Sequence, residues 1–225
     1  MIIPPPNITL GIGAEIIYSF VIIVCSLMIY FGTKKIYELS SYKGIKYFRQ
    51  AFLLFAIAYF FRFLIEFVVI SFNTNEIFEI SPIAVGYFAV FIFMYLSSIS
   101  IFYLIYSISW KKLKSKSMIL YLFHIISIII ALVSVIFRNQ IFYIGLNIIL
   151  LIYATFVIYF ASRRQDKSKR NSFYFAYILL LIFWVLNVLN IFVPVFFDSL
   201  KLFIYLTSLC IFLVILYKVL KKSGD

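Results

Sequence analysis

The chain has very few of the side chains on which enzymes and metal centres depend. Its 225 residues include one histidine, His124, and eight acidic residues. No HExxH motif is present, and Asp166, Asp198 and Asp225 lie outside the apolar runs. Intramembrane proteolysis needs a Ser–His pair, paired aspartates or HExxH. We therefore expect a protein that is not an enzyme and that holds no metal and no cofactor.

Cysteine is equally scarce. Cys25 and Cys210 both lie within apolar stretches, and no CxxC motif or other metal-ligand spacing occurs. We interpret both as small apolar residues rather than as metal ligands.

Apolar residues, by contrast, are in large excess. The chain is 65% hydrophobic and 21% aromatic, with a mean hydropathy of +1.12. A soluble domain of this size is closer to half apolar. So much apolar surface does not fit inside one water-soluble core, so lipid must cover the outside. The composition predicts an all-α polytopic protein of the cell membrane.

Seven apolar runs are long enough to span a bilayer, and we predict a single membrane domain over residues 1–225. The predicted spans are 10–31, 51–72, 82–110, 118–137, 141–161, 173–197 and 199–220. Alternate connecting segments hold nearly all of the lysine and arginine, whereas the other set holds only Arg138 and Lys201. The positive-inside rule then places the N-terminus outside and the C-terminus inside.

The net charge of +12 lies in short basic clusters between the apolar runs. This distribution favours contacts between the inner basic loops and anionic lipids, and it argues against nucleic acid as a partner.

An internal repeat relates the two halves of the chain. Segment 28–35 is similar to 157–164, and segment 95–102 is similar to 205–212, in the same order and sidedness. One helix, 118–137, separates the two copies. Because each copy has three spans, this single extra span returns the chain to the side on which the first copy began, so the two copies are parallel. The sequence thus predicts two parallel three-helix units joined by the fourth helix.

This three-plus-one-plus-three arrangement resembles the seven-helix proteins that include SWEET transporters, PQ-loop transporters and microbial opsins. The resemblance covers most of the chain and rests on architecture. No Pro-Gln motif ends the first or fifth helix, and the lysines of the seventh helix, Lys201 and Lys218, lie near its two ends. The resemblance therefore implies neither retinal nor any site residue.

Two charged residues, Arg62 and Glu66, lie one turn apart within the second apolar run. Charges in hydrocarbon are costly, and this spacing lets the pair neutralise itself on one helix face. Four polar residues of other runs lie at a similar depth, namely Ser97, Asn147, Asn187 and Asn190. If these faces point inward, they form a central polar pocket for a ligand. The alternative is that they form hydrogen bonds that brace the helices.

Some polar and aromatic residues are predicted to have structural roles. Ser127, Ala131 and Ser134 form a small-residue stripe suited to close helix packing. Glu15, about one turn inside the outer end of the first helix, is expected to reach water. Trp110 and the tyrosines at helix ends are expected to be interfacial anchors.

The repeat and the charged pair favour a transporter of a small solute or ion. One alternative is a receptor-like sensor that acts through a separate membrane or soluble protein partner. The other is a structural subunit of a membrane complex.

Overall fold

The structure is a computed structural model that describes residues 8–74, 82–110, 116–137, 140–163, 171–192 and 198–224, with side-chain environments for most of them. Within these ranges there are no strands and seven long helices. The long helices are α1 (Ile8–Gly32), α3 (Lys43–Thr74), α4 (Pro82–Ser109), α5 (Lys116–Phe137), α6 (Gln140–Arg163), α7 (Asn171–Phe192) and α8 (Asp198–Gly224). A short helix, α2 (Lys34–Ser40), joins α1 to α3. The predicted all-helical class is confirmed.

Each predicted apolar run falls on one long helix, although the helices extend beyond several of the runs. The clearest extension is α3, which begins at Lys43 in a basic segment before the apolar run starts. Between α2 and α3, Ser41 adopts a left-handed conformation with φ 49° and accounts for the change of direction. Residues 193–197, predicted as the end of the sixth span, lie outside the described residues.

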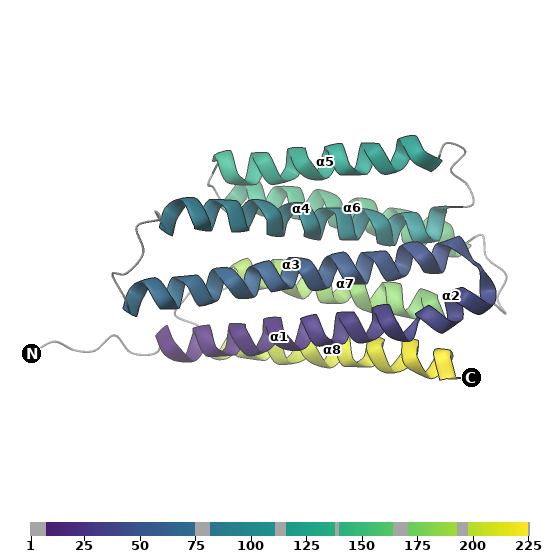
Figure 1. Ribbon diagram of the computed structural model, residues 1–225, viewed down its shortest axis with the longest axis horizontal. Helices are drawn as coiled ribbons and strands as arrows, with labels where there is room; N and C mark the ends of the chain where they lie inside the picture. The colour runs from purple at the N-terminus through teal and green to yellow at the C-terminus, as the bar shows by residue number, and fades with distance from the viewer. Residues whose placement is uncertain are drawn as a thin grey trace, which may run out of the picture.

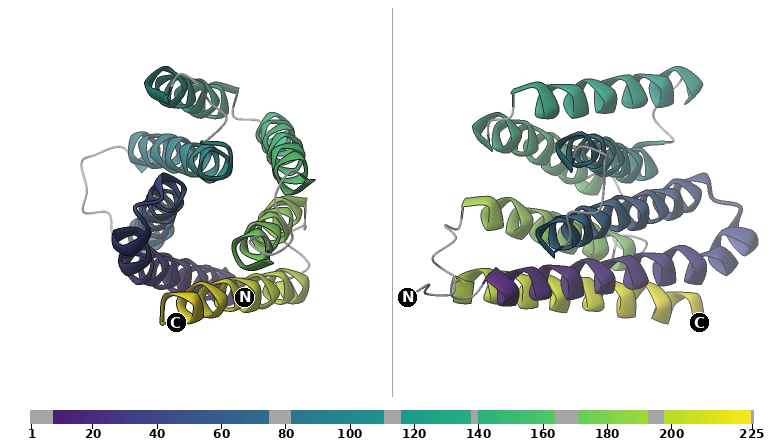
Figure 2. Two further views of the ribbon diagram at one scale, coloured as in Figure 1. Left: turned by 90° about the vertical axis from the view of Figure 1, so that its right-hand side faces the viewer. Right: turned by 60° about the vertical axis from the view of Figure 1, so that its left-hand side comes forward.

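The long helices run alternately up and down, and the two ends of the chain lie at opposite ends of the bundle (Figure 1). Viewed along the bundle, six of the described helices form a ring in the order α1, α3, α4, α6, α7 and α8, and α8 packs back against α1 (Figure 2). The remaining long helix, α5, lies outside this ring and packs mainly on α4.

The contact between α5 and α4 uses the predicted small-residue stripe. Ser127 and Ala131 are fully buried. One turn earlier on the same face, Phe123 stacks on Phe102 of α4, with ring centroids 4.9 Å apart. The neighbouring His124 Nδ1 lies 2.7 Å from the hydroxyl of Tyr95 in α4. The histidine is therefore satisfied by a packing contact between the two helices.

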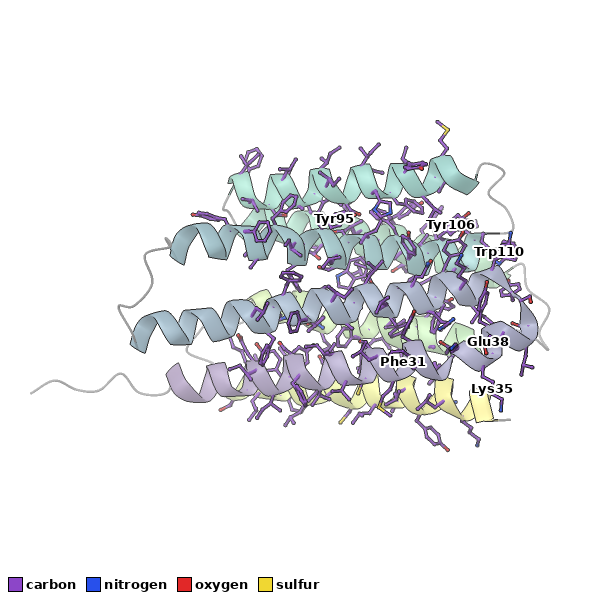
Figure 3. All side chains as sticks on the ribbon, viewed as in Figure 1. Phe31, Lys35, Glu38, Tyr95, Tyr106 and Trp110 are labelled. Atoms are coloured by element: carbon purple, nitrogen blue, oxygen red, sulfur yellow. The ribbon has the colours of Figure 1, made fainter. Side chains whose placement is uncertain are left out.

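The outer faces of the helices are strongly apolar. On α5, Tyr121, Ile125 and Ile136 are each more than half exposed, and Figure 3 shows side chains projecting away from this helix. Among the described residues, five helical stretches are long and apolar enough to cross a membrane, namely Gly13–Ser40, Lys43–Leu64, Tyr87–Ser109, Met118–Phe137 and Ser199–Lys221. Hydrocarbon is the solvent that such faces fit, which agrees with a helical membrane protein.

The buried side chains form two apolar clusters. The first joins α1, α3, α7 and α8 and includes Phe52, Phe183 and Phe212. The second joins α4, α5 and α6 and includes Phe102 and Phe123. The two clusters meet inside the ring of helices, where the candidate site lies.

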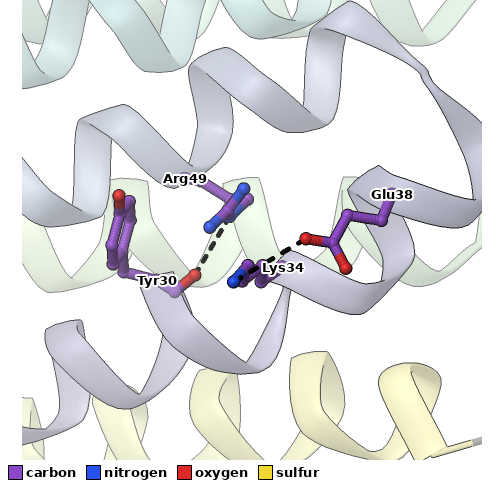
Figure 4. A network of polar contacts seen from close by, with 4 residues as sticks. All are labelled: Tyr30, Lys34, Glu38 and Arg49. Carbon is purple, nitrogen blue, oxygen red and sulfur yellow. Dashed lines mark hydrogen bonds and ion pairs between the residues drawn. The ribbon is translucent and has the colours of Figure 1, made fainter.

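One end of the bundle carries most of the described basic side chains. There, Arg49 Nε donates to the carbonyl oxygen of Tyr30 at 3.0 Å, and its guanidinium lies 4.8 Å from the centroid of the Tyr30 ring (Figure 4). This contact ties α3 to α1. The ion pair between Lys34 and Glu38, with Nζ 3.8 Å from Oε1, is well exposed and contributes little.

At the same end, α3 approaches the end of α4 closely. Gly44 is buried, and a Cβ placed on it would lie 2.7 Å from the backbone oxygen of Ser107. A glycine at this position therefore permits a helix contact that a larger residue blocks.

Candidate functional site

A cavity of about 400 Å³ lies inside the ring, between α3, α4, α6 and α7, with one residue contributed by α1. Most of the lining residues fall into two groups that differ in polarity. The polar end of the cavity comprises Glu15, Tyr59, Arg62, Ser97, Asn147 and Asn187. The apolar end comprises Ile101, Leu104, Ile105, Ala154, Ile158 and Leu180.

The predicted site residues come together here in four cases out of six. Arg62 from α3, Ser97 from α4, Asn147 from α6 and Asn187 from α7 all line this cavity. The other two, Glu66 on α3 and Asn190 on α7, have side chains outside the described residues.

The amide of Asn187 is held by two tyrosines. Its Oδ1 accepts hydrogen bonds from the hydroxyls of Tyr18, at 3.0 Å, and Tyr59, at 3.2 Å. Its Nδ2 donates to the backbone oxygen of Phe183, one turn earlier in α7, at 2.9 Å. Three helices are thus joined at one amide, and the Asn187 side chain is fixed in orientation.

The two charged groups of the polar end are packed among the same tyrosines. The Arg62 guanidinium carbon lies 5.8 Å from the ring centroids of both Tyr18 and Tyr59. Glu15 Oε1 accepts a hydrogen bond of 2.5 Å from the hydroxyl of Tyr205 in α8, and the Tyr205 ring packs against Tyr18 with centroids 4.8 Å apart. Aromatic faces and hydroxyls therefore surround both charges, which offsets part of the cost of placing them in an apolar bundle.

The remaining polar residues have local partners. Trp184 Nε1 lies 3.4 Å from Asn147 Oδ1, which links α7 to α6. The Ser97 hydroxyl donates to the backbone oxygen of Phe93 in its own helix. That bond uses the only Ser97 donor and leaves its oxygen able to accept.

A hydrogen bond spans the bundle at the apolar end of the cavity, where Tyr177 is also a lining residue. The Tyr177 hydroxyl of α7 lies 2.6 Å from Ser107 Oγ of α4. Because Ser107 donates its single hydrogen to the backbone oxygen of Leu104 at 2.6 Å, Tyr177 is the donor in this pair. The Tyr177 ring also packs edge-on against Phe48 of α3, with centroids 5.6 Å apart. Three helices thus meet at the end of the cavity that lies toward the basic end of the bundle.

Several of these residues were not predicted from the sequence. Tyr18, Tyr59 and Tyr205 lie well within their helices, whereas only the tyrosines at helix ends were assigned a role from the sequence, that of interfacial anchors. Glu15 was expected to reach water, but it lies about two turns into α1, lines the cavity and binds Tyr205. The available signal was depth, because the three tyrosines and Glu15 lie at a similar level of the apolar runs.

The described residues contain no group of three or more histidine, cysteine, aspartate or glutamate side chains close enough to hold a metal ion. The donors that line the cavity are amides, hydroxyls, an indole and a guanidinium. They suit hydrogen bonding to an organic solute better than metal coordination.

A protein of Archaeoglobus fulgidus, described as an uncharacterized protein, is 32% identical to this chain over 217 residues. The matched region spans 94% of this chain and 93% of the archaeal protein. The chain belongs to the same family as that protein. The similarity extends over nearly the whole of both chains and is not confined to one segment.

No family model matches the chain, and no solved structure matches it. The likeness to SWEET, PQ-loop and opsin proteins therefore remains a resemblance in architecture.

Proposed function

We propose that this protein is a multi-pass transporter of the cell membrane that binds a small solute in the cavity and carries it across. The observation that carries the proposal is the convergence of Arg62, Ser97, Asn147 and Asn187, from four helices, on one cavity. Residues that only brace helices have no need to share a space of about 400 Å³. That size is in the range of ligand sites, as is a mainly apolar lining with a few fixed polar groups.

The ring order of the helices supports the interpretation as two parallel repeats. The first unit, α1, α3 and α4, occupies one arc of the ring, and the second, α6, α7 and α8, occupies the other. A half-turn about the bundle axis would exchange α1 with α6, α3 with α7 and α4 with α8. In this account α5 is the linker, and the two units rock against each other to expose the cavity to alternate sides.

The charge distribution supports an orientation with the N-terminus outside. The described basic side chains at one end include Lys34, Lys35, Lys43, Lys46, Lys218 and Lys221. In this orientation they face the cytoplasm and contact anionic lipids, each contributing about 1 kcal/mol near such a surface. The polar end of the cavity then lies toward the outside, and the bond between Tyr177 and Ser107 lies on the inner side.

Transport is tested with purified protein in proteoliposomes and a panel of labelled solutes, namely leucine, glucose, choline and octanoate. We expect saturable uptake of at least one of them, and we expect Asn187→Leu to reduce it tenfold or more. The matched control is Thr207→Ala, which removes a hydroxyl that donates to the Phe203 backbone oxygen of its own helix and is not part of the cavity lining, and it should leave uptake unchanged. The absence of saturable uptake for every solute in the panel would count against transport.

A sensor that acts through a separate partner is the second candidate. The observation that favours it is the bond between Tyr177, which lines the cavity, and Ser107, through which an occupied site can act on the inner, basic end. A sensor binds a solute saturably in the cavity but carries no net flux of it, whereas a transporter shows saturable binding and net flux. Comparing equilibrium binding with uptake for the same solute therefore separates the two candidates.

A further inference from the structure

We infer that Glu15 is a proton-binding site and that a proton taken up there opens the polar end of the cavity. This inference rests on the proposed function, because it names a second ligand of the same site, the proton, and its effect on access to the cavity. It follows from where the Glu15 carboxylate lies and from what it binds.

Glu15 is an acidic side chain within an apolar helix. It lies about two turns into α1 and lines the cavity. Its Oε1 accepts a hydrogen bond from Tyr205 of α8, and among the described side chains none forms an ion pair with it. A carboxylate at such a depth is costly, and acidic side chains in this setting bind and relay protons in pumps and transporters. A proton is the ligand that neutralises such a group in place.

The bond between Tyr205 and Glu15 is strongest when the carboxylate is ionised. A hydroxyl bond to a carboxylate is short, at about 2.5–2.7 Å, and roughly twice as strong as a bond between neutral groups. The distance of 2.5 Å between the Tyr205 hydroxyl and Glu15 Oε1 fits this charge-assisted form. A proton that binds to the carboxylate forms the neutral acid and removes the charge assistance, so it weakens the bond.

The same bond belongs to a set that holds the polar end together. Tyr205 of α8 bonds Glu15 of α1, and its ring packs on Tyr18 with centroids 4.8 Å apart. Tyr18 of α1 and Tyr59 of α3 both bond Asn187 of α7. In the proposed transporter, α1 and α3 belong to one unit and α7 and α8 to the other. All three bonds therefore join the two units, and weakening one of them favours their separation at this end.

A low pH should therefore open the polar end. The bonded form stabilises the ionised carboxylate, so by linkage the open form binds the proton more tightly. Among the described residues, the titratable or charged side chains around Glu15 are Tyr18 of α1, Tyr59 and Arg62 of α3, and Lys201 and Tyr205 of α8, and α7 presents the neutral Asn187. Tyrosine, lysine and arginine ordinarily lose their protons only at about pH 10 or above. Glu15 is thus the member of this set that changes charge as the pH falls from neutral.

The test measures how fast a thiol in the cavity reacts. Ser97→Cys, on the cavity lining, is the reporter in a chain whose two native cysteines are replaced by alanine. The full-length protein is held in nanodiscs, where a small water-soluble methanethiosulfonate reaches both membrane faces. The rate of each variant is divided by that of the parent at the same pH, because this ratio cancels the effect of pH on the thiol itself.

Glu15→Gln, which is uncharged at every pH, is the decisive variant. At about pH 8 it should react about fivefold faster than the parent, whose carboxylate is then ionised. As the pH is lowered to about 5, the ratio should fall toward one, because the parent becomes neutral as well. Glu38→Gln is the matched control, since it makes the same change at an exposed residue of α2 outside the cavity. Its ratio should stay within about twofold of one at both pH values.

Tyr205→Phe tests whether the proton acts through this bond. The substitution keeps the ring that packs on Tyr18 and removes the hydroxyl that Glu15 accepts. At about pH 8 it should react about fivefold faster than the parent, and its ratio should fall toward one at about pH 5. Adding Glu15→Gln should increase the rate no further, because the two changes remove the same interaction. This arm gives an answer even if Glu15→Gln alone fails to fold.

Three results would overturn the inference. They are a ratio for Glu15→Gln that is the same at both pH values, an equal rise with Glu38→Gln, and additive effects of Glu15→Gln and Tyr205→Phe. Uptake by proteoliposomes tests the proposed function separately. If a solute is taken up saturably but the ratio does not depend on pH, the proton site is wrong and the proposed function stands. If the ratio behaves as expected but no solute is taken up, the proton site stands and the transporter is wrong.

Discussion

The two ends of the cavity are built in different ways. At the polar end, hydroxyl and amide groups from α1, α3 and α7 meet at the Asn187 side chain, next to the Arg62 cation. At the apolar end the lining is mainly aliphatic, and Tyr177, which also lines the cavity, bonds Ser107. A structural brace needs polar groups at helix contacts, but it does not need them gathered at one end of a cavity. The difference favours a site that orients its ligand.

The two ends also differ in how closely the helices approach. Beyond the apolar end, Gly44 lets α3 reach the backbone of α4 at Ser107, and the neighbouring Tyr177 brings in α7. At the polar end, large aromatic residues lie between the helices, as Tyr18 of α1 and Tyr59 of α3 do with ring centroids 6.0 Å apart. A glycine thus permits a close backbone approach at one end, whereas tyrosines whose hydroxyls are hydrogen-bonded line the other.

The largest effect should come from Gly44→Ala at the position of close backbone approach. The added Cβ would lie 2.7 Å from the Ser107 oxygen, so α3 and α4 must separate, at a cost of about 3 kcal/mol. Thermal unfolding of the purified protein measures this as a lower midpoint. Gly145→Ala in α6 is the matched control, because its Cβ meets nothing within 4 Å, and it should be neutral or slightly stabilising. Equal stability of the two variants would contradict the close approach.

An intermediate effect should come from Asn187→Leu at the polar end. It removes the acceptor of two tyrosine hydroxyls, and we expect a loss of about 2 kcal/mol in the free energy of unfolding. In a Tyr18→Phe, Tyr59→Phe background the same substitution should cost less than half as much, since no hydroxyl is left without its acceptor. Unfolding of the four proteins in one double-mutant cycle measures the coupling. A coupling near zero would mean that the two tyrosine bonds do not hold the amide.

The smallest effect should come from Tyr177→Phe, which removes only the hydroxyl that crosses from α7 to α4. A single hydrogen bond between membrane helices contributes about 0.6 kcal/mol on average. We expect a loss of this size, equal to that of Ser107→Ala, and no further loss in the double variant. Thr155→Ala, which removes an exposed hydroxyl bonded within its own helix, is the control and should have no measurable effect. Additive losses in the double variant would show that the two hydroxyls act independently.

The helices could be predicted from the sequence because long apolar runs define them. The buried face of α5 could also be predicted, because the small residues Ser127 and Ala131 are suited to close packing and are fully buried. Depth along each helix also brought Arg62, Asn147 and Asn187 into one predicted group. The ring order of the helices could not be predicted, because apolar faces toward lipid and toward protein have the same composition.

The tyrosines of the polar end were missed for a related reason. With 18 tyrosines in the chain, depth along the apolar runs separates Tyr18, Tyr59 and Tyr205 from the tyrosines at helix ends, but it does not say whether they face the cavity or the lipid. Tyr18 and Tyr205 become significant only when α1 and α8, far apart in the sequence, lie side by side. Contacts of this kind depend on tertiary packing.

If the protein is a transporter, water and solutes enter the cavity that the polar residues line. The most direct test is thiol accessibility in a background where both native cysteines are alanine. Ser97→Cys lies on the cavity, whereas Ser100→Cys, on the same helix, replaces a fully buried hydroxyl that donates to the Ala51 backbone oxygen at 2.9 Å. We predict that a small water-soluble methanethiosulfonate modifies Ser97→Cys at least tenfold faster than Ser100→Cys in intact membranes. Equally slow modification of both would contradict the account and would show that the polar residues brace the helices.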